Sequence, residues 1–248
     1  MEPNNEKREK LKEFYFRIKN CRSCELCSTR VNFVFGSGNS NARILFIGEA
    51  PGKNEDLQGR PFVGQAGKLL DDLLAGIGFT RDKVFIANVL KCRPPANRDP
   101  DLTEISICKQ YLFEQIEIID PVIICTMGRY STQLILNTTE GITKLRGNIF
   151  KINRRLILPI NHPAAALYAP SRISVLKEDF NRIKSVFEKV IDAENAGHGA
   201  REGQDEEAEL VKTTVYANKP GRHEGEDLNE SMAGSQKYAN ENQQLGLF

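Results

Sequence analysis

The chain has 248 residues, of which 40% are hydrophobic, and its formal net charge is +1. This length is sufficient for one well-packed core. The near-neutral charge excludes a basic field over the whole molecule, so binding to nucleic acid has to depend on local patches. No apolar run is long enough to span a bilayer, and the charged amino-terminal segment lacks the apolar centre of a signal peptide. We therefore expect a cytoplasmic protein without a membrane segment.

Strand and helix patterns alternate along the first 192 residues. Residues 4–20 form a helical pattern with Leu11, Phe14, Tyr15 and Ile18 on one face. Strand patterns then occupy residues 42–48, 83–90, 122–128 and 155–160, and helical patterns occupy residues 66–77, 103–119, 129–138 and 172–192. This alternation predicts βαβ units, and therefore a mostly parallel sheet with helices on both faces.

A change of composition near Ala193 divides the chain. Residues 193–248 are polar, charged and poor in aromatic side chains, so they bury too little apolar surface to offset the entropy lost on ordering. We predict a folded domain at residues 1–192 and a disordered tail at residues 193–248. The last five residues, 244–248 (QLGLF), depart from this pattern because three of them are large and apolar.

A loop rich in glycine connects the first of these strand patterns to the helical pattern that follows it. Its sequence, at residues 48–67, is GEAPGKNEDLQGRPFVGQAG. Open α/β sheets place ligand sites at the carboxyl ends of their strands. Glycine lets the backbone approach a ligand closely, and the start of a helix offers free N–H groups. Because the loop also contains acids, bases and a phenylalanine, it is more typical of a ligand site than of an ordinary connection.

The chain contains six cysteines, which in a cytoplasmic protein indicate metal binding or catalysis before disulfides. Cys21 and Cys24 form a C-x2-C pair, which is a local chelating unit. Cys92 ends a strand pattern and Cys108 lies in the next helical pattern, whereas Cys125 lies inside an apolar run that is typical of a core thiol. Four such thiolates fit either a zinc ion or a [4Fe–4S] cluster, and ligand type alone does not separate the two.

Three motifs follow the C-x2-C pair in order: GEAPGKNEDLQGRPFVGQAG, NVLKCRPPANRDP and NHPAAAL. Through them, residues 10–190 resemble the family 4 uracil-DNA glycosylases, the iron–sulfur branch of that superfamily. The resemblance implies an α/β chain with a three-layer α/β/α uracil-DNA glycosylase-like fold and a central four-stranded parallel sheet. It also implies a monofunctional enzyme of base excision repair, which we expect to be a monomer. Such an enzyme hydrolyses the N-glycosidic bond of flipped-out deoxyuridine in single- or double-stranded DNA, releases uracil and leaves an abasic site.

The resemblance also favours a [4Fe–4S] cluster over zinc. Its implied ligands are Cys21, Cys24, Cys92 and Cys108. Cys27 is additional to this four-cysteine pattern, and it is either a spare thiol or a competitor of Cys24 as ligand.

Three residues of the motifs fit the recognition and release of uracil. By resemblance, His162 donates a hydrogen bond to uracil O2 and stabilises the departing anion. The amide of Asn88 offers a donor and an acceptor that match uracil O4 and N3–H and mismatch cytosine. The ring of Phe62 would stack on the flipped base. The simpler interpretations are a structural histidine, a turn or capping asparagine and a core phenylalanine.

Two acids of the glycine-rich loop are further candidates. Glu49, with the backbone of Ala50 and Pro51, matches the motif position beside the attacking water and the uracil, where a carboxylate can orient water and face the cationic sugar. Relatives carry Asn, Asp or Gln at this place. Of the roles that the resemblance implies, the role of Glu49 is therefore the least directly transferable from the family to this chain. Glu55 either closes the site near uracil C5 and excludes the methyl group of thymine, or pairs with a basic side chain of its own loop.

Contacts with DNA are predicted from charge and from exposed apolar residues. Leu167 and Tyr168, shortly after His162, are candidates for a wedge that fills the gap left by the flipped base; alternatively they pack under the loop. Basic residues near the predicted site loops could contact phosphates: Lys91, Arg93, Arg98, Arg146, Arg154, Arg155 and Arg172.

The carboxyl-terminal pentapeptide resembles the short QLxLF peptide by which bacterial DNA-repair and replication proteins bind the sliding clamp. Gln244, Leu245, Leu247 and Phe248 match, and Gly246 differs from the usual Ser or Asp. An apolar terminus on a long polar tether has no core of its own to join. We therefore expect it to bind an external hydrophobic groove with modest affinity and to raise the local concentration of the enzyme on replicating DNA.

Other functions are compatible with parts of this sequence. A glycosylase of the same fold could act on another deaminated base. An iron–sulfur DNA-binding or redox protein could use the cysteines without hydrolysis, but the residues predicted to bind uracil would then have no purpose. A nucleotide-binding module is disfavoured because the loop lacks GxxxxGK[ST] and does not fit GxGxxG.

Overall fold

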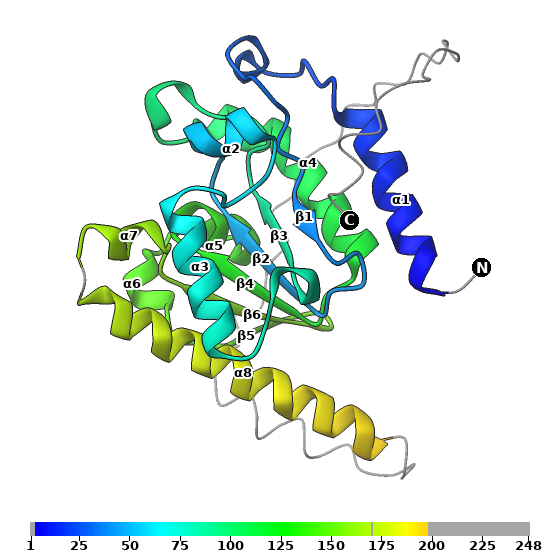
Figure 1. Ribbon diagram of the computed structural model, residues 1–248, viewed down its shortest axis with the longest axis vertical. Coiled ribbons are helices and arrows are strands. Elements are labelled where there is room, and N and C mark those ends of the chain that lie inside the picture. The colour runs from blue at the N-terminus through cyan, green and yellow to red at the C-terminus, as the bar shows by residue number, and fades with distance from the viewer. Residues whose placement is uncertain (1–2, 170, 198–248) are drawn as a thin grey trace.

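The computed structural model describes residues 3–169 and 171–197 (Figure 1). The pentapeptide at 244–248 and the predicted tail from residue 198 onward lie outside the described residues. None of the described helices is both long enough and apolar enough to cross a membrane.

A six-stranded mixed sheet forms the centre of the fold, with the strand order β1-β3-β2-β4-β6-β5. The strands are β1 (Ser37–Gly38), β2 (Ile44–Gly48), β3 (Phe85–Asn88), β4 (Ile123–Met127), β5 (Phe150–Ile152) and β6 (Arg155–Ile160). The four inner strands are parallel, as predicted, and each falls within a predicted strand segment. The two edge strands β1 and β5 are antiparallel to their neighbours, and the sequence analysis did not predict them. They are too short to show a periodic pattern.

Helices cover both faces of this sheet, which confirms the predicted α/β/α class (Figure 1). The α-helices are α1 (Pro3–Ile18), α2 (Lys53–Gln58), α3 (Gln65–Gly76), α4 (Leu102–Ile119), α5 (Arg129–Leu136), α6 (Ile142–Leu145), α7 (Ala164–Leu167) and α8 (Arg172–Gly197). Three short 3₁₀ segments are η1 (Glu25–Ser28), η2 (Arg81–Lys83) and η3 (Pro95–Asn97). The helix α8 extends to Gly197, whereas the sequence pattern predicts a helix that ends at 192.

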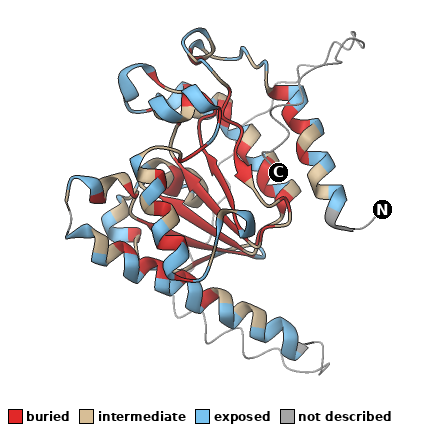
Figure 2. Cartoon of the chain, viewed as in Figure 1, coloured by how far each residue is buried: buried red, intermediate tan, exposed pale blue. Residues whose placement is uncertain are grey.

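Alternate side chains of the strands enter two separate cores, because successive residues of a strand point to opposite faces. On one face, Leu45 and Ile47 of β2 join a core that includes α1 and α4. On the other face, Ile44 and Phe46 join a core that includes α3 and α8. There the rings of Phe46 and Phe180 stack with centroids 5.7 Å apart. Figure 2 shows the buried sheet between helices whose outer faces are exposed. This rigid sheet fixes the strand ends from which the site is built.

Candidate active site

The predicted site residues gather at one end of the parallel sheet. Glu49 directly follows β2, Asn88 is the last residue of β3, and His162 follows the end of β6. Gly48 and Asn88 are register partners on neighbouring strands. The carboxyl ends of parallel strands lie along one edge, and this is the place where open α/β sheets bind ligands.

Asn88 and Phe62 meet above the bare backbone of Gly48. A Cβ atom added to Gly48 would lie 2.4 Å from Asn88 Oδ1 and 2.8 Å from the Phe62 ring, so no larger residue fits here. Asn88 is 2% exposed, and within the described part of the chain its Oδ1 has no hydrogen-bond partner. An unsatisfied buried acceptor costs about 1–3 kcal/mol. This carbonyl oxygen is therefore available to a donor that a ligand brings.

Phe62 is held in an unusual backbone conformation. Its φ angle is +53°, which for a residue other than glycine costs roughly 1–2 kcal/mol. A Cβ atom on Gly67 would lie 1.8 Å from the Phe62 carbonyl oxygen, so α3 can approach this turn only because residue 67 is glycine. The Phe62 ring is 5% exposed and stacks on the His162 ring, with centroids 5.5 Å apart and an interplanar angle of 28°.

His162 is held as a neutral donor. Its Nδ1 accepts a hydrogen bond from the Ala164 N–H at 3.2 Å, so the ring proton lies on Nε2. Burial lowers the pKa of His162 to about 4, although the negative charge of Glu55 opposes this shift. At neutral pH the ring therefore presents an N–H group without a positive charge.

Glu49 lies beside a polar network that the sequence analysis did not identify. Arg129 Nη2 and the Tyr130 hydroxyl both donate to Asp99 Oδ2, at 3.0 and 2.8 Å. Burial raises the pKa of Glu49 to about 7; the negative charge of Asp99 adds to this rise, and Arg129 opposes it. A carboxyl group with this pKa can exchange a proton near neutral pH. No sequence signal joins Asp99 to Glu49, because only folding brings their segments together.

Glu55 binds the backbone of its own loop. Its Oε1 accepts hydrogen bonds from the N–H groups of Val63 and Gly64, both at 2.9 Å. Among the ion pairs of the described residues, none joins Glu55 to Lys53 or Arg60, the basic side chains of its loop. The carboxylate therefore fixes the turn that carries Phe62, and its role in excluding thymine stays a prediction. Ala50 is half-buried and Pro51 is buried where this loop leaves β2.

The four predicted ligand cysteines lie close enough to influence one another. Cys92 and Cys108 are buried, and Cys21 and Cys24 are half-buried. Burial raises the pKa of Cys108 to about 12, and negative charge on Cys92 or Cys24 adds to the rise. Burial likewise raises the pKa of Cys92, where Cys24 and Cys21 contribute in the same direction. Burial raises the pKa of Cys24, and Cys21 and Cys27 add to this rise.

Polar side chains line this group of thiols. Arg30 Nη1 donates to Cys92 Sγ at 3.2 Å, and the Tyr111 hydroxyl lies 3.2 Å from Cys21 Sγ. The buried Lys91 Nζ donates to the Asn88 carbonyl oxygen at 2.9 Å and to Gln115 Oε1 at 2.6 Å. In residues 3–169 and 171–197, no three His, Cys, Asp or Glu side chains come together in a group that could hold a single metal ion.

Comparison with known proteins gives one matching family model and several similar relatives. The family model of the uracil DNA glycosylase superfamily matches residues 35–188. The type-4 uracil-DNA glycosylase of Sulfurisphaera tokodaii is 48% identical over 187 residues, which cover 72% of this chain and 84% of the relative. That of Saccharolobus solfataricus is 48% identical over 193 residues, covering 74% and 89%. That of Archaeoglobus fulgidus is 44% identical over 183 residues, covering 71% and 92%.

The chain belongs to the type-4 uracil-DNA glycosylase family. This confirms the family that the three sequence motifs indicated. The segment matched by the superfamily model contains the strand-end residues, Cys92 and Cys108, whereas Cys21 and Cys24 precede it.

The two wedge candidates of this type-4 chain are exposed. Leu167 ends α7 and is 42% exposed, and Tyr168 directly after it is 90% exposed. Tyr168 thus does not pack beneath the loop. Because α7 begins two residues after His162, both side chains project from the segment that leaves the active site.

Several basic residues that were predicted to contact DNA lie in the interior of this type-4 chain or far from the candidate site. Lys91 is fully buried. Arg155 is the first residue of β6, and with Arg154 it lies at the opposite end of the parallel sheet, where both pair with Asp120. Arg155 also begins the strand pattern at residues 155–160, so the sequence already placed both arginines at the amino end of that strand.

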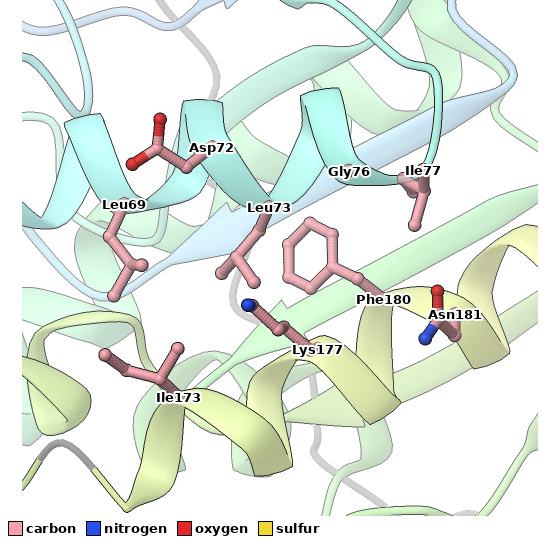
Figure 3. A pocket seen from close by; sticks show the side chains of 9 residues that line it. All are labelled: Leu69, Asp72, Leu73, Gly76, Ile77, Ile173, Lys177, Phe180 and Asn181. Carbon is pink, nitrogen blue, oxygen red and sulfur yellow. The ribbon is translucent and has the colours of Figure 1, made fainter.

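An open groove of about 500 Å³ lies between α3 and α8, away from these site residues. Figure 3 shows Leu69 and Leu73 of α3 facing Ile173 and Phe180 of α8, with Lys177 beside them. None of the three residues predicted to bind the base lines this groove. In this type-4 enzyme it is therefore separate from the candidate active site.

Proposed function

We propose that this chain is a uracil-DNA glycosylase of base excision repair, which hydrolyses the N-glycosidic bond of deoxyuridine and leaves an abasic site. The observation that carries the proposal is the buried, unpartnered Oδ1 of Asn88 beside Phe62 and His162. Family membership supports the same activity. We also propose that the enzyme acts in the cytoplasm and that it is a monomer.

Recognition of uracil depends on the direction of two hydrogen bonds. The Asn88 Oδ1 would accept from uracil N3–H, and its amide nitrogen would donate to uracil O4. Cytosine presents an acceptor at N3 and a donor at N4, so both contacts would be lost. A buried polar group that is left unpaired rejects the wrong ligand strongly. The ring of Phe62 would stack on the flipped base, a contact worth about 1–3 kcal/mol by alanine substitution.

Departure of the base depends on His162. In the tautomer fixed by Ala164, Nε2–H can donate to uracil O2, where negative charge develops as the glycosidic bond breaks. A neutral donor can stabilise this charge without giving up its proton, and the lowered pKa keeps the ring neutral. The base would therefore leave as an anion.

Glu49 would orient the attacking water. In its ionised form the carboxylate accepts a proton or a hydrogen bond from water and faces the cationic sugar. The backbone of Ala50 and Pro51 would lie beside the same water and the uracil. The Glu49 carbonyl oxygen accepts a hydrogen bond from the Leu90 N–H at 2.9 Å, which ties this segment to the end of β3.

A [4Fe–4S] cluster is proposed for Cys21, Cys24, Cys92 and Cys108. The mutual effect of these thiols on their pKa values supports the assignment. Such a cluster binds each thiolate at a different iron, so its ligands need not converge on one point. When bound, it would cross-link the segment after α1, the end of β3 and α4, and would thereby stabilise the fold.

Two further contacts are proposed. Leu167 and Tyr168 would enter the gap that the flipped base leaves in the stack, because both are exposed in the segment that follows His162. Residues 244–248 would bind a sliding clamp, on the strength of their resemblance to the QLxLF peptide.

An excision assay tests the proposed function. The protein is incubated with single- and double-stranded oligonucleotides that contain one uracil, and abasic sites are cleaved with alkali before electrophoresis. Matched oligonucleotides with cytosine, thymine or hypoxanthine at the same position are the controls. Cleavage of the uracil strands alone is expected. Cleavage only at hypoxanthine would indicate another deaminated base, and no cleavage would favour a DNA-binding or redox protein.

A further inference from the structure

One arginine outside all the sequence motifs holds the loop that carries Phe62. Arg81 donates from Nη1 to the Pro61 carbonyl oxygen at 3.1 Å and from Nη2 to the Phe62 carbonyl oxygen. The same Nη2 lies 3.5 Å from the Gly67 carbonyl oxygen, and Nε donates to Asp71 Oδ1 at 2.5 Å. A single guanidinium group therefore ties two residues of the loop to the first turns of α3.

The backbone of Phe62 needs such support. Its positive φ angle is unfavourable for a phenylalanine, and its carbonyl group is pressed against the backbone of Gly67. Arginine suits this place because its planar group carries five donors in a fixed geometry, whereas lysine offers one compact ammonium group. Asp71 in turn fixes the direction of the Arg81 side chain.

We propose that Arg81 is a positioning residue that holds the Phe62 ring where the flipped base must stack. The proposal rests on the proposed function, because it assigns Arg81 to the recognition step of that reaction. The hydrogen bonds of Arg81 go to loop backbone and to Asp71, so it acts through Phe62. Reactions of this kind are sensitive to small misplacements of the groups that bind the substrate.

Loss of Arg81 should affect the chemical step more than DNA binding. Without the guanidinium, the loop can relax toward an ordinary φ angle, and the Phe62 ring then leaves its place above Gly48. Affinity for DNA comes largely from phosphate contacts, which this change leaves in place. We therefore expect a lower kcat with little change in KM.

A double-mutant cycle tests this inference in single-turnover excision of uracil from single-stranded DNA. Arg81→Gln is expected to slow excision by roughly tenfold in the wild-type background and by less than about twofold in a Phe62→Ala background. Asp71→Asn is a milder variant, since the Asp71 side chain is 45% exposed, and should show the same dependence on Phe62. Arg154→Gln, at the opposite end of the sheet, is the matched control and should keep the wild-type rate.

Hydrogen exchange gives a second readout that does not depend on activity. The Val63 and Gly64 N–H groups donate to Glu55 within the same turn, so they should exchange at least roughly tenfold faster in Arg81→Gln and unchanged in Arg154→Gln. Unchanged exchange in Arg81→Gln would overturn the proposal, as would a rate loss that is equally large with and without Phe62. If wild-type protein excises no uracil, the proposed function fails, while the exchange result still decides whether Arg81 fixes this loop.

Discussion

The ionisation of Glu49 is expected to set the pH dependence of uracil excision. Burial, with the added effect of Asp99, raises the pKa of Glu49 to about 7. Only the carboxylate form can orient water and face the cationic sugar, so the rate should follow the ionised fraction. Burial lowers the pKa of His162 to about 4, so this ring stays neutral above pH 5 and adds no second inflection there.

The size of the effect follows from this pKa. The ionised fraction of a group with a pKa near 7 falls from about 0.9 at pH 8 to about 0.01 at pH 5. The single-turnover rate should therefore fall by roughly ninetyfold over this range, with its midpoint near pH 7. Asp99→Asn should move the midpoint to lower pH, because it removes the neighbouring negative charge.

The assay is excision from a uracil-containing single strand, measured with excess enzyme from pH 5 to pH 8. Glu49→Gln is the matched control, and its lower rate should be independent of pH. A wild-type rate that is flat across this range, or an inflection that survives in Glu49→Gln, would refute the assignment of the pH dependence to Glu49.

The same pKa has a consequence for stability. A carboxyl group with a raised pKa favours the folded state at low pH, and this contribution is lost as the pH rises from the unfolded value of about 4.3 through about 7. Glu49→Gln should therefore raise Tm at pH 8 and leave it nearly unchanged at pH 4. Equal effects at both pH values would contradict the raised pKa.

Five further variants test other assignments. His162→Ala should slow single-turnover excision by roughly tenfold to a hundredfold, about 1.4–2.7 kcal/mol of barrier, while affinity for abasic-site product changes less; an unchanged rate would remove His162 from the mechanism. Asn88→Asp should relax discrimination against cytosine. Unchanged selectivity for uracil over cytosine would contradict the role of Asn88 in recognising the base. After anaerobic purification, Cys92→Ala should lack the visible absorption of an iron–sulfur cluster, and much of the protein should fail to fold. Cys27→Ala should keep both the absorption and the folded state. Wild-type protein that is colourless and contains zinc would show that the proposed metal is wrong. Deletion of residues 244–248 should abolish binding to a sliding clamp in calorimetric titration and leave excision intact; equal binding by the truncated chain would exclude this peptide as the contact.

The central layer of the fold could be predicted from local patterns. The strands β2, β4 and β6 are buried on both faces of the sheet. Because both faces need apolar side chains, these strands form continuous hydrophobic segments in the sequence. The edge strands β1 and β5 gave no such signal, because two or three residues cannot establish a period. Their pairing is decided by neighbouring strands that are far away in the sequence.

The sequence by itself indicated the candidate side chains for the chemistry: Glu49 and His162 follow strand patterns, Asn88 lies near the carboxyl end of another, and the order of strands and helices places those ends along one edge. Only the tertiary structure decided the hydrogen-bond partners, the pKa values and the support of these groups. The unpartnered Asn88 Oδ1, the influence of Asp99 on Glu49 and the support of Phe62 by Arg81 all arise between segments that are distant in the chain. The physical reason is that hydrogen bonds, burial and charge depend on distances through space, whereas a sequence pattern records only spacing along the backbone.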